Sequence, residues 1–272
     1  MAHRMYPEER LRDKLSNLGI PRDKHALQTM QSMVPARFDE MPFDSCDPDV
    51  LAEILIYLLS RNIVRLPCER SAALSLEWGT HICHFYRDPK ELLELLVAYM
   101  QEGLQNNEYC VWVLADSLTS EQALEAMRQG IPSLHLHGDR FELFAHDEWY
   151  LDAAGKMRDR DALLAGWVEK EQRALAQGYA GLRLTGDTHW LDQKNWSGFI
   201  QYECDVNAAV DGSRMKALCT YSRRQCGEHE IMEVLHGHQT VLAKKNDWWY
   251  RITTSQDHAA RAVLEAMEGE WK

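Results

Sequence analysis

One stretch, residues 79–116, limits most strongly what this chain can fold into. The segment from Ile82 to Tyr86 is short, apolar and aromatic, which is typical of a strand. Pro89 suits the first turn of a helix, leucines follow it at helical spacing, and Gly103 is expected to end that helix. The nearly continuous apolar run 109–115 predicts a strand buried on both faces. Two strands joined by a helix form a right-handed βαβ unit, so we expect an α/β fold with a mostly parallel sheet.

The loop after the first strand argues against nucleotide binding. In open α/β sheets, ligands bind beyond the carboxyl ends of the strands, which here places Tyr86, Arg87 and Asp88 at the relevant edge. A phosphate-binding loop would need glycines there, followed by Lys and Ser or Thr. The loop has no glycine, and Lys90 stands alone with no Ser or Thr after it, so we expect no ATP binding and no ATP hydrolysis.

Composition restricts the protein class. The chain has 272 residues, of which 45% are hydrophobic, enough for one large domain with an appendage or for two domains. No run reaches the roughly 18 apolar residues that a membrane span requires. The first residues carry charges with no apolar segment behind them, unlike a secretory signal. We therefore expect a cytoplasmic protein without a membrane partner.

Charge is distributed unevenly along the chain. The net charge of −12 argues against a general nucleic-acid binder, because phosphate contacts need clustered Lys and Arg. Residues 1–37 contain seven basic and four acidic residues, a net +3, so the remainder carries −15. The residues from 7 to 34 have the pattern of two helices broken at Gly19-Ile20-Pro21, which fits a DNA-binding helix-turn-helix or an ordinary helical hairpin. Residues 1–75 are thus expected to form a helical N-terminal region.

Patterns typical of strands and of helices follow one another over residues 76–252, which predicts that the α/β domain covers this range. A C-terminal helix is expected within 253–272. The later strands are predicted at Phe141–Ala145, Gly181–Gly186 and Met215–Tyr221, with one or two more in 239–252. The later helices are predicted from Thr119, over 159–177, over Trp196–Val210 and over Glu228–His236. A loop is predicted at 147–150, after the strand Phe141–Ala145.

Six stretches together resemble one family. They are GTHICHFY (79–86), GLQNNEYCVWVLAD (103–116), GYAGLRLTGDTHW (178–190), QYECDVN (201–207), ALCTYSRRQC (217–226) and VLHGHQTVL (234–242). Over about residues 76–250 the chain resembles the sensory domain shared by methanogens, methylotrophs and the dichloromethane-response regulator, called the MEDS domain. The resemblance implies a three-layer RecA/KaiC-like α/β core that has lost its phosphate loop. It also implies signalling: such domains occur in transcription regulators and beside histidine-kinase modules, and are thought to sense small hydrocarbon derivatives.

The expected ligand site lies at the carboxyl ends of the strands. Asp187 could accept a hydrogen bond from a ligand and Trp190 could form an apolar wall. Alternatively, Asp187 caps the next segment and Trp190 belongs to the core. The residues predicted to contribute are Tyr86, Arg87, Asp116, Asp187, Trp190, Tyr221 and Arg223.

Two further side chains need partners or suggest chemistry. Arg183 is predicted in a buried strand and needs an acidic partner, for which Glu203 is a candidate. Cys226 follows Arg223 and Arg224, and positive neighbours can make a thiol reactive, so a redox role is one hypothesis and an inert thiol the other.

Histidines and cysteines give no recognisable metal motif. His81 with His84, His135 with His137, and His236 with His238 are close in sequence, but no CxxC or HExxH spacing supports a metal site. We therefore expect His81 and His238 to be hydrogen-bonded core residues, and no metal. The odd number of cysteines, seven, fits a reducing compartment better than a disulfide framework.

The sequence predicts a sensory or regulatory protein that binds a small molecule or a partner at its strand ends. It contains no Ser-His-Asp order and no nucleophile elbow, so no catalytic residue is predicted and the balance is against an enzyme. One alternative is a DNA-binding transcription regulator acting through residues 1–34. A second is a redox- or metal-dependent enzyme. The sequence leaves open which cofactor, if any, binds, whether the partner is DNA or a signalling protein, and whether the chain forms a homo-oligomer.

Overall fold

The computed structural model describes residues 74–114, 117–191, 193–238, 240–245 and 248–253. The predictions for residues 1–73, for Asp116 and for the C-terminal helix lie outside these ranges. Within them, residues 74–243 and 251–253 belong to one compact unit, and 244–250 to another. The account below concerns the first unit; only the last two strands of the sheet include residues of the second. Its helices include none that is long and apolar enough to cross a membrane, among the residues described.

A parallel sheet forms the centre of this unit. Its strands are β1 (Thr80–Tyr86), β2 (Tyr109–Leu114), β3 (Phe141–Ala145), β4 (Leu182–Asp187), β5 (Met215–Ser222), β6 (Thr240–Lys245) and β7 (Trp248–Thr253). The spatial order is β3-β2-β4-β5-β1-β6-β7, and the five pairings from β3 to β6 are all parallel. The mostly parallel α/β architecture predicted from the sequence is therefore confirmed.

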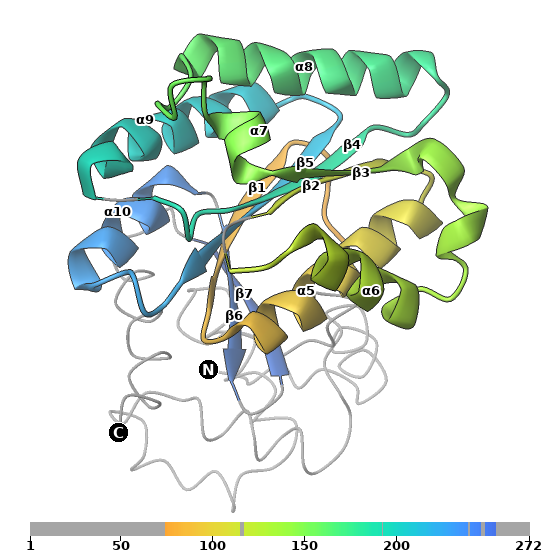
Figure 1. Cartoon of the computed structure of the whole chain (residues 1–272), viewed down its shortest axis with the longest axis horizontal. Coiled ribbons are helices and arrows are strands. Elements are labelled where there is room, and N and C mark those ends of the chain that lie inside the picture. Colours follow the sequence, from red (N-terminus) through yellow and green to blue (C-terminus); the bar gives the residue numbers. More distant parts are fainter. Residues whose placement is uncertain (1–73, 115–116, 192, 239, 246–247, 254–272) are drawn as a thin grey trace, which may run out of the picture. The chain divides into compact units, whose positions relative to one another are not determined.

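Helices cover the sheet on both faces, giving three layers (Figure 1). On one face lie α5 (Pro89–Gln105) and α6 (Ser120–Gly130), and on the other lie α8 (Arg160–Ala176) and α9 (Gln193–Val210). The helix α10 (Glu228–Gly237) packs against α9. Short helices at Leu134–Leu136, Gly138–Arg140 and α7 (His146–Tyr150) occupy connections. The α7 segment was predicted as a loop.

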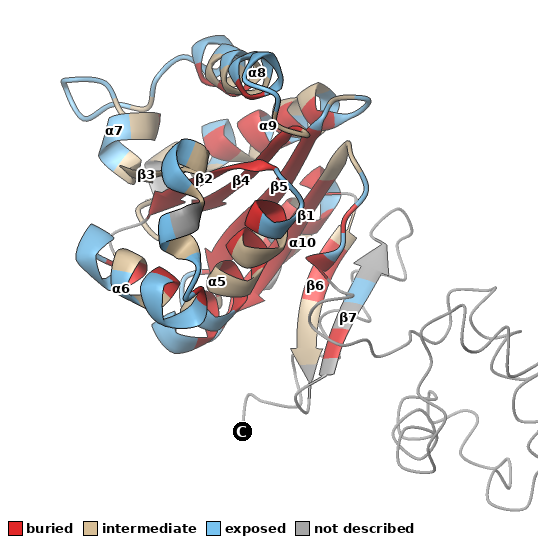
Figure 2. Ribbon diagram, turned by 90° about the vertical axis from the view of Figure 1, so that its right-hand side faces the viewer, coloured by how far each residue is buried: buried red, intermediate tan, exposed pale blue. Residues whose placement is uncertain are grey.

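The central strands are buried along their whole length, as Figure 2 shows in red. All six residues of β2 and all eight of β5 are buried. This burial on both faces explains why their sequences are nearly continuous apolar runs rather than alternating patterns. The polar side chains that these strands do contain are therefore costly unless they find partners inside the protein.

Local signals fix the helix starts close to where the sequence places them. Asp88 accepts a hydrogen bond from the backbone N–H of Glu91, and Pro89 occupies the first turn of α5. Thr119 and Gln122 form a reciprocal capping box at α6. These side chains satisfy backbone N–H groups that a helix start leaves without partners.

Gly103 does not end α5, contrary to the prediction. The helix continues to Gln105, and Gly103 lies buried against the sheet. A Cβ at this position would lie 2.6 Å from Cδ of Arg183 and 2.7 Å from Sγ of Cys110. Glycine is therefore needed for close packing of the helix on β2 and β4, and not for a left-handed turn.

Arg183 pairs with Glu108, and not with Glu203 as predicted. Its Nε donates to Glu108 Oε2 at 2.5 Å, and Lys216 Nζ donates to Glu108 Oε1 at 2.7 Å. The guanidinium also lies over the ring of Tyr99, 4.6 Å from its centroid. The prediction failed because alternation along β4 puts Arg183 on the face covered by α5, whereas Glu203 on α9 covers the other face.

Candidate functional site

The connections from the strands change direction at the carboxyl edge of the sheet. β1 leads to α5 on one face, whereas its neighbour β5 leads to α10, which packs against α9 on the other. β2 and β4 are also neighbours and lead to α6 and α9, again on opposite faces. Adjacent strands whose connections diverge in this way mark the position where open α/β sheets bind ligands.

A buried polar cluster lies at this edge and is centred on Asp187, the last residue of β4. Its Oδ2 accepts a hydrogen bond from Thr220 Oγ1 at 3.0 Å, and its Oδ1 accepts from the backbone N–H of His189 at 2.8 Å. Tyr86, the last residue of β1, donates from its hydroxyl to Oδ1 at 3.4 Å. The structure thus brings together two of the predicted site residues, Tyr86 and Asp187.

The pKa of the Asp187 carboxyl is raised toward neutrality. Burial raises its pKa to about 6, although the hydrogen bonds from His189, Thr220 and Tyr86 oppose the rise. Burial also raises the pKa of Tyr86, and the negative charge of Asp187 adds to this effect. A carboxyl whose pKa lies near neutrality responds to any group that donates to it or covers it.

In the loop between β1 and α5, the carboxylate of Glu91 accepts hydrogen bonds from Arg87. Glu91 Oε2 accepts from the backbone N–H of Arg87 at 3.1 Å and from its Nε at 2.7 Å. Although burial raises the pKa of Glu91, its contacts with His84 and Arg87 lower the value to about 2. Arg87, a predicted site residue, is therefore held by Glu91.

Trp190 lies beyond the end of β4 in an aromatic group. Its ring stacks on His146 at 5.6 Å and on Tyr150 at 5.2 Å between centroids, and meets Phe199 edge to face at 6.0 Å. The residue is half-buried. Its Nε1 is buried and finds no hydrogen-bond partner within the described part of the chain. Trp190 is thus neither a fully buried core residue nor a freely exposed one.

The remaining predicted residues take different positions. Tyr221 points to the opposite face of the sheet, where it contacts Phe85, Trp196 and His238. Arg223 donates its backbone N–H to the carbonyl of Tyr86. Cys226 is buried, and burial raises the pKa of its thiol to about 12, which disfavours the thiolate that a redox role needs.

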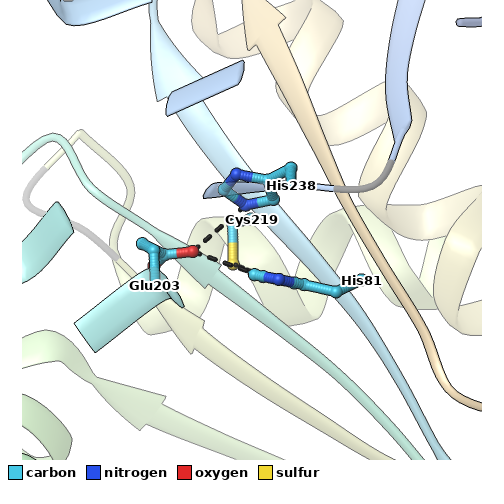
Figure 3. Close-up of side chains that lie close together, drawn as sticks. All are labelled: His81, Glu203, Cys219 and His238. Carbon is cyan, nitrogen blue, oxygen red and sulfur yellow. Dashed lines mark hydrogen bonds and ion pairs between the residues drawn. The ribbon is translucent and has the colours of Figure 1, made fainter. Parts of the chain in front are cut away.

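A second buried cluster occupies the face of the sheet covered by α9 (Figure 3). It contains His81 from β1, Glu203 from α9, Cys219 from β5 and His238, which follows α10. Nε2 of His81 lies 3.3 Å from Oε2 of Glu203 and 3.4 Å from Sγ of Cys219. Nε2 of His238 lies 3.1 Å from the same Glu203 oxygen, and the two imidazole centroids are 4.1 Å apart.

This cluster carries a buried negative charge. Burial raises the pKa of Glu203, but contacts with His238 and His81 outweigh this effect and hold it well below its usual range. Burial, with the nearby His238, lowers the pKa of His81 to about 4. His81 and His238 are core residues, as predicted, but their proximity to Glu203 and Cys219 was not predicted. The only signal was the strand alternation that puts His81 and Cys219 on one face.

Comparison with known proteins identifies the family. The model of the family described as "MEthanogen/methylotroph, DcmR Sensory domain" matches residues 80–239, more than half of the chain. The transcriptional repressor DcmR of Methylorubrum extorquens is 26% identical over 172 residues, which are 62% of this chain and 61% of the repressor. The match therefore spans less than two thirds of that relative.

A solved structure is similar at a lower level. The flagellar accessory protein FlaH from Methanocaldococcus jannaschii matches with 14% identity and a TM-score of 0.41, over 67% of this chain and 80% of that one. The family match contains both Asp187 and the four residues of the buried His-Glu-Cys cluster. The chain belongs to the MEDS family of sensory domains.

Proposed function

We propose that this protein senses a small molecule, which binds at the carboxyl edge of the sheet between Asp187 and Trp190. The observation that carries the proposal is the buried Asp187 carboxyl at the end of β4, held by donors from three segments at the position where such sheets bind ligands. A sensory family supplies the context for a ligand and not for catalysis.

The polar and apolar halves of the site complement each other. Asp187 can accept a hydrogen bond from an O–H or N–H group of the ligand. Trp190 offers a half-buried indole face and an Nε1–H that lacks an acceptor among the described residues. Covering about 100 Å² of such a ring contributes a few kcal/mol at about 25 cal/mol per Å². These features favour a small, weakly polar compound, such as a short hydrocarbon derivative with one hydroxyl, amine or halogen.

A thermal-shift screen of the full-length protein tests the proposal. The probes are short-chain alcohols, amines and halogenated hydrocarbons. A compound at a hundred times its Kd stabilises the folded state by about 2.7 kcal/mol, which raises Tm by about 5 °C or more. We expect at least one compound to do so, and Trp190→Ala to weaken its binding at least tenfold.

Trp196→Ala is the matched control. Trp196 is also half-buried, but its Nε1 already donates to Glu233 Oε2 at 2.7 Å. The control variant should keep the wild-type ligand affinity even where its stability falls. Equal loss of affinity in both tryptophan variants, with native circular dichroism, would contradict a site at Trp190.

A second function follows from the DcmR relative. We infer that the sensory unit regulates transcription, with residues 1–34 contacting DNA, because the matched relative is a transcriptional repressor and this segment is basic. Titration of fluorescent duplex DNA at two salt concentrations tests it. Arg22→Ala with Lys24→Ala should weaken binding and reduce its salt dependence. A folded double mutant with unchanged DNA affinity would remove these residues from DNA recognition.

A further inference from the structure

The cluster of His81, Glu203, Cys219 and His238 has the geometry of a metal centre (Figure 3). One ligand atom from each residue lies within 4.8 Å of the others, and all four residues are at most 7% exposed. Nitrogen and sulfur ligands around a tetrahedral Zn²⁺, at about 2.0–2.3 Å from the ion, are separated by roughly 3.3–3.8 Å. The contacts of 3.1, 3.3 and 3.4 Å in the cluster are already close to this spacing.

The orientation of His238 points a lone pair into the cluster. Its Nδ1 lies 2.8 Å from the carbonyl oxygen of Val234. A carbonyl oxygen can only accept, so Nδ1 carries the proton, and in the neutral ring Nε2 has a lone pair. That lone pair faces Glu203 Oε2, another acceptor, at 3.1 Å. Two acceptors at this distance repel unless a cation or a second ring proton lies between them.

The surroundings resemble those of metal-binding histidines. A metal-bound imidazole usually donates its other N–H to a carbonyl or carboxylate, which fixes its orientation. Val234 supplies that acceptor for His238.

The ligand types and charges select one class of ion. Thiolate with imidazole favours Zn²⁺ over the oxygen-seeking Mg²⁺ and Ca²⁺. Zn²⁺ displaces the proton of the Cys219 thiol, which leaves to solvent as the Zn–S bond forms, with no change of oxidation state. The ion, the Glu203 carboxylate and the Cys219 thiolate then sum to zero charge, which avoids burying an unbalanced charge.

We propose that His81, Glu203, Cys219 and His238 bind one Zn²⁺ ion in a closed, four-coordinate centre. The site would join β1, β5, α9 and the segment after α10, which are separated by up to 157 positions in the chain from His81 to His238. Four protein ligands leave no open position, so the ion is structural and stabilises the folded unit. The inference is independent of the ligand proposed between Asp187 and Trp190, because none of the four cluster residues belongs to that site.

Metal content and Co²⁺ substitution test the site. Full-length protein purified without chelator should carry close to one Zn²⁺ per chain by mass spectrometry of the elements. After removal of zinc, addition of Co²⁺ should give a thiolate-to-cobalt charge-transfer band and the intense visible bands of tetrahedral cobalt. This spectrum needs no variant, so it decides the question even where a substitution prevents folding.

Cys219→Ser and Cys83→Ser form a matched pair. Cys83 on β1 is directly opposite Cys219 in the strand register, is also buried, and is not among the four converging residues. We expect Cys219→Ser to abolish the charge-transfer band and weaken Zn²⁺ affinity about a hundredfold or more, and Cys83→Ser to leave both unchanged. Wild-type protein that binds neither Zn²⁺ nor Co²⁺, or Cys219→Ser with the wild-type Co²⁺ spectrum, would overturn the proposal.

Discussion

Thr220 donates its hydroxyl to the carboxylate of Asp187 across the neighbouring strands β5 and β4, with 3.0 Å between Oγ1 and Oδ2. This hydrogen bond favours the ionised form of the Asp187 carboxyl, whose pKa is raised by burial. Because both side chains lie at the edge where ligands bind in such sheets, the hydrogen bond links the stability of the fold to the state of the proposed site.

The raised pKa of Asp187 predicts that stability falls as pH rises from 4 to 7. The folded state holds the proton up to a pKa of about 6, whereas an unfolded aspartate releases it near 3.9. The stabilisation is therefore fully present below about pH 4 and is lost as pH rises through 6. Across this range wild type should lose about 3 kcal/mol relative to Asp187→Asn, measured by urea unfolding.

The neighbours of Asp187 supply the control for this prediction. Tyr86, His189, Tyr150 and Cys226 are the titratable groups that interact with it. Thr220→Val removes a donor that favours the ionised carboxylate, so the fall in stability should move to higher pH. Identical pH profiles for wild type and Asp187→Asn would assign the dependence to another group.

Gly103→Ala should destabilise the protein although alanine is the better helix former. The new Cβ would lie 2.6 Å from Arg183 and 2.7 Å from Cys110, an overpacking that costs about 1–3 kcal/mol. Gly198→Ala on α9 is the control, since its Cβ would meet nothing within 4 Å. That variant should gain up to about 1 kcal/mol from helix propensity. Chemical unfolding compares them, and equal effects would refute the packing role of Gly103.

Glu108→Gln should cost about 3–5 kcal/mol of unfolding free energy. It leaves the buried Arg183 and Lys216 without their shared carboxylate. Arg160→Ala, which breaks the exposed pair with Asp205, should cost about 1 kcal/mol or less. A Glu108→Gln variant as stable as Arg160→Ala would mean that the buried cations are neutralised in another way.

ATP should not bind with low-micromolar affinity. The start of α5, where a phosphate would be held in a nucleotide-binding relative of this architecture, is occupied by Asp88 and Glu91. Two carboxylates repel phosphate and already accept from the local N–H groups. Isothermal titration with Mg²⁺-ATP checks this, and saturable heat at low micromolar concentration would disprove it.

Local patterns predicted the elements well. The strand Phe141–Ala145 has the same bounds in the structure, and the helix expected from Thr119 starts at Ser120 with Thr119 as its cap. These features depend on spacing and capping within a few residues. The role of Gly103 could not be predicted from such local patterns. A glycine is needed there because the side chain of Arg183, 80 positions further along the chain, leaves no room for a Cβ.

Contacts between distant segments were the part that sequence reasoning missed. It sought metal ligands among histidines close in sequence, whereas the structure joins His81 with His238. It paired Arg183 with Glu203, because the sequence does not show which face of the sheet each helix covers. At the carboxyl edge of the sheet, strand order was enough to bring Tyr86 to Asp187, but not to place Tyr221, which faces the other way.

Hydrogen exchange measured by mass spectrometry, with and without the compound that raises Tm most, tests the ligand site most directly. Binding at the carboxyl edge should slow exchange in the segments 86–91 and 187–191, and Trp190→Ala should abolish that protection while Trp196→Ala retains it. Protection confined to other segments, or no compound that protects the wild-type protein, would contradict a ligand site between Asp187 and Trp190.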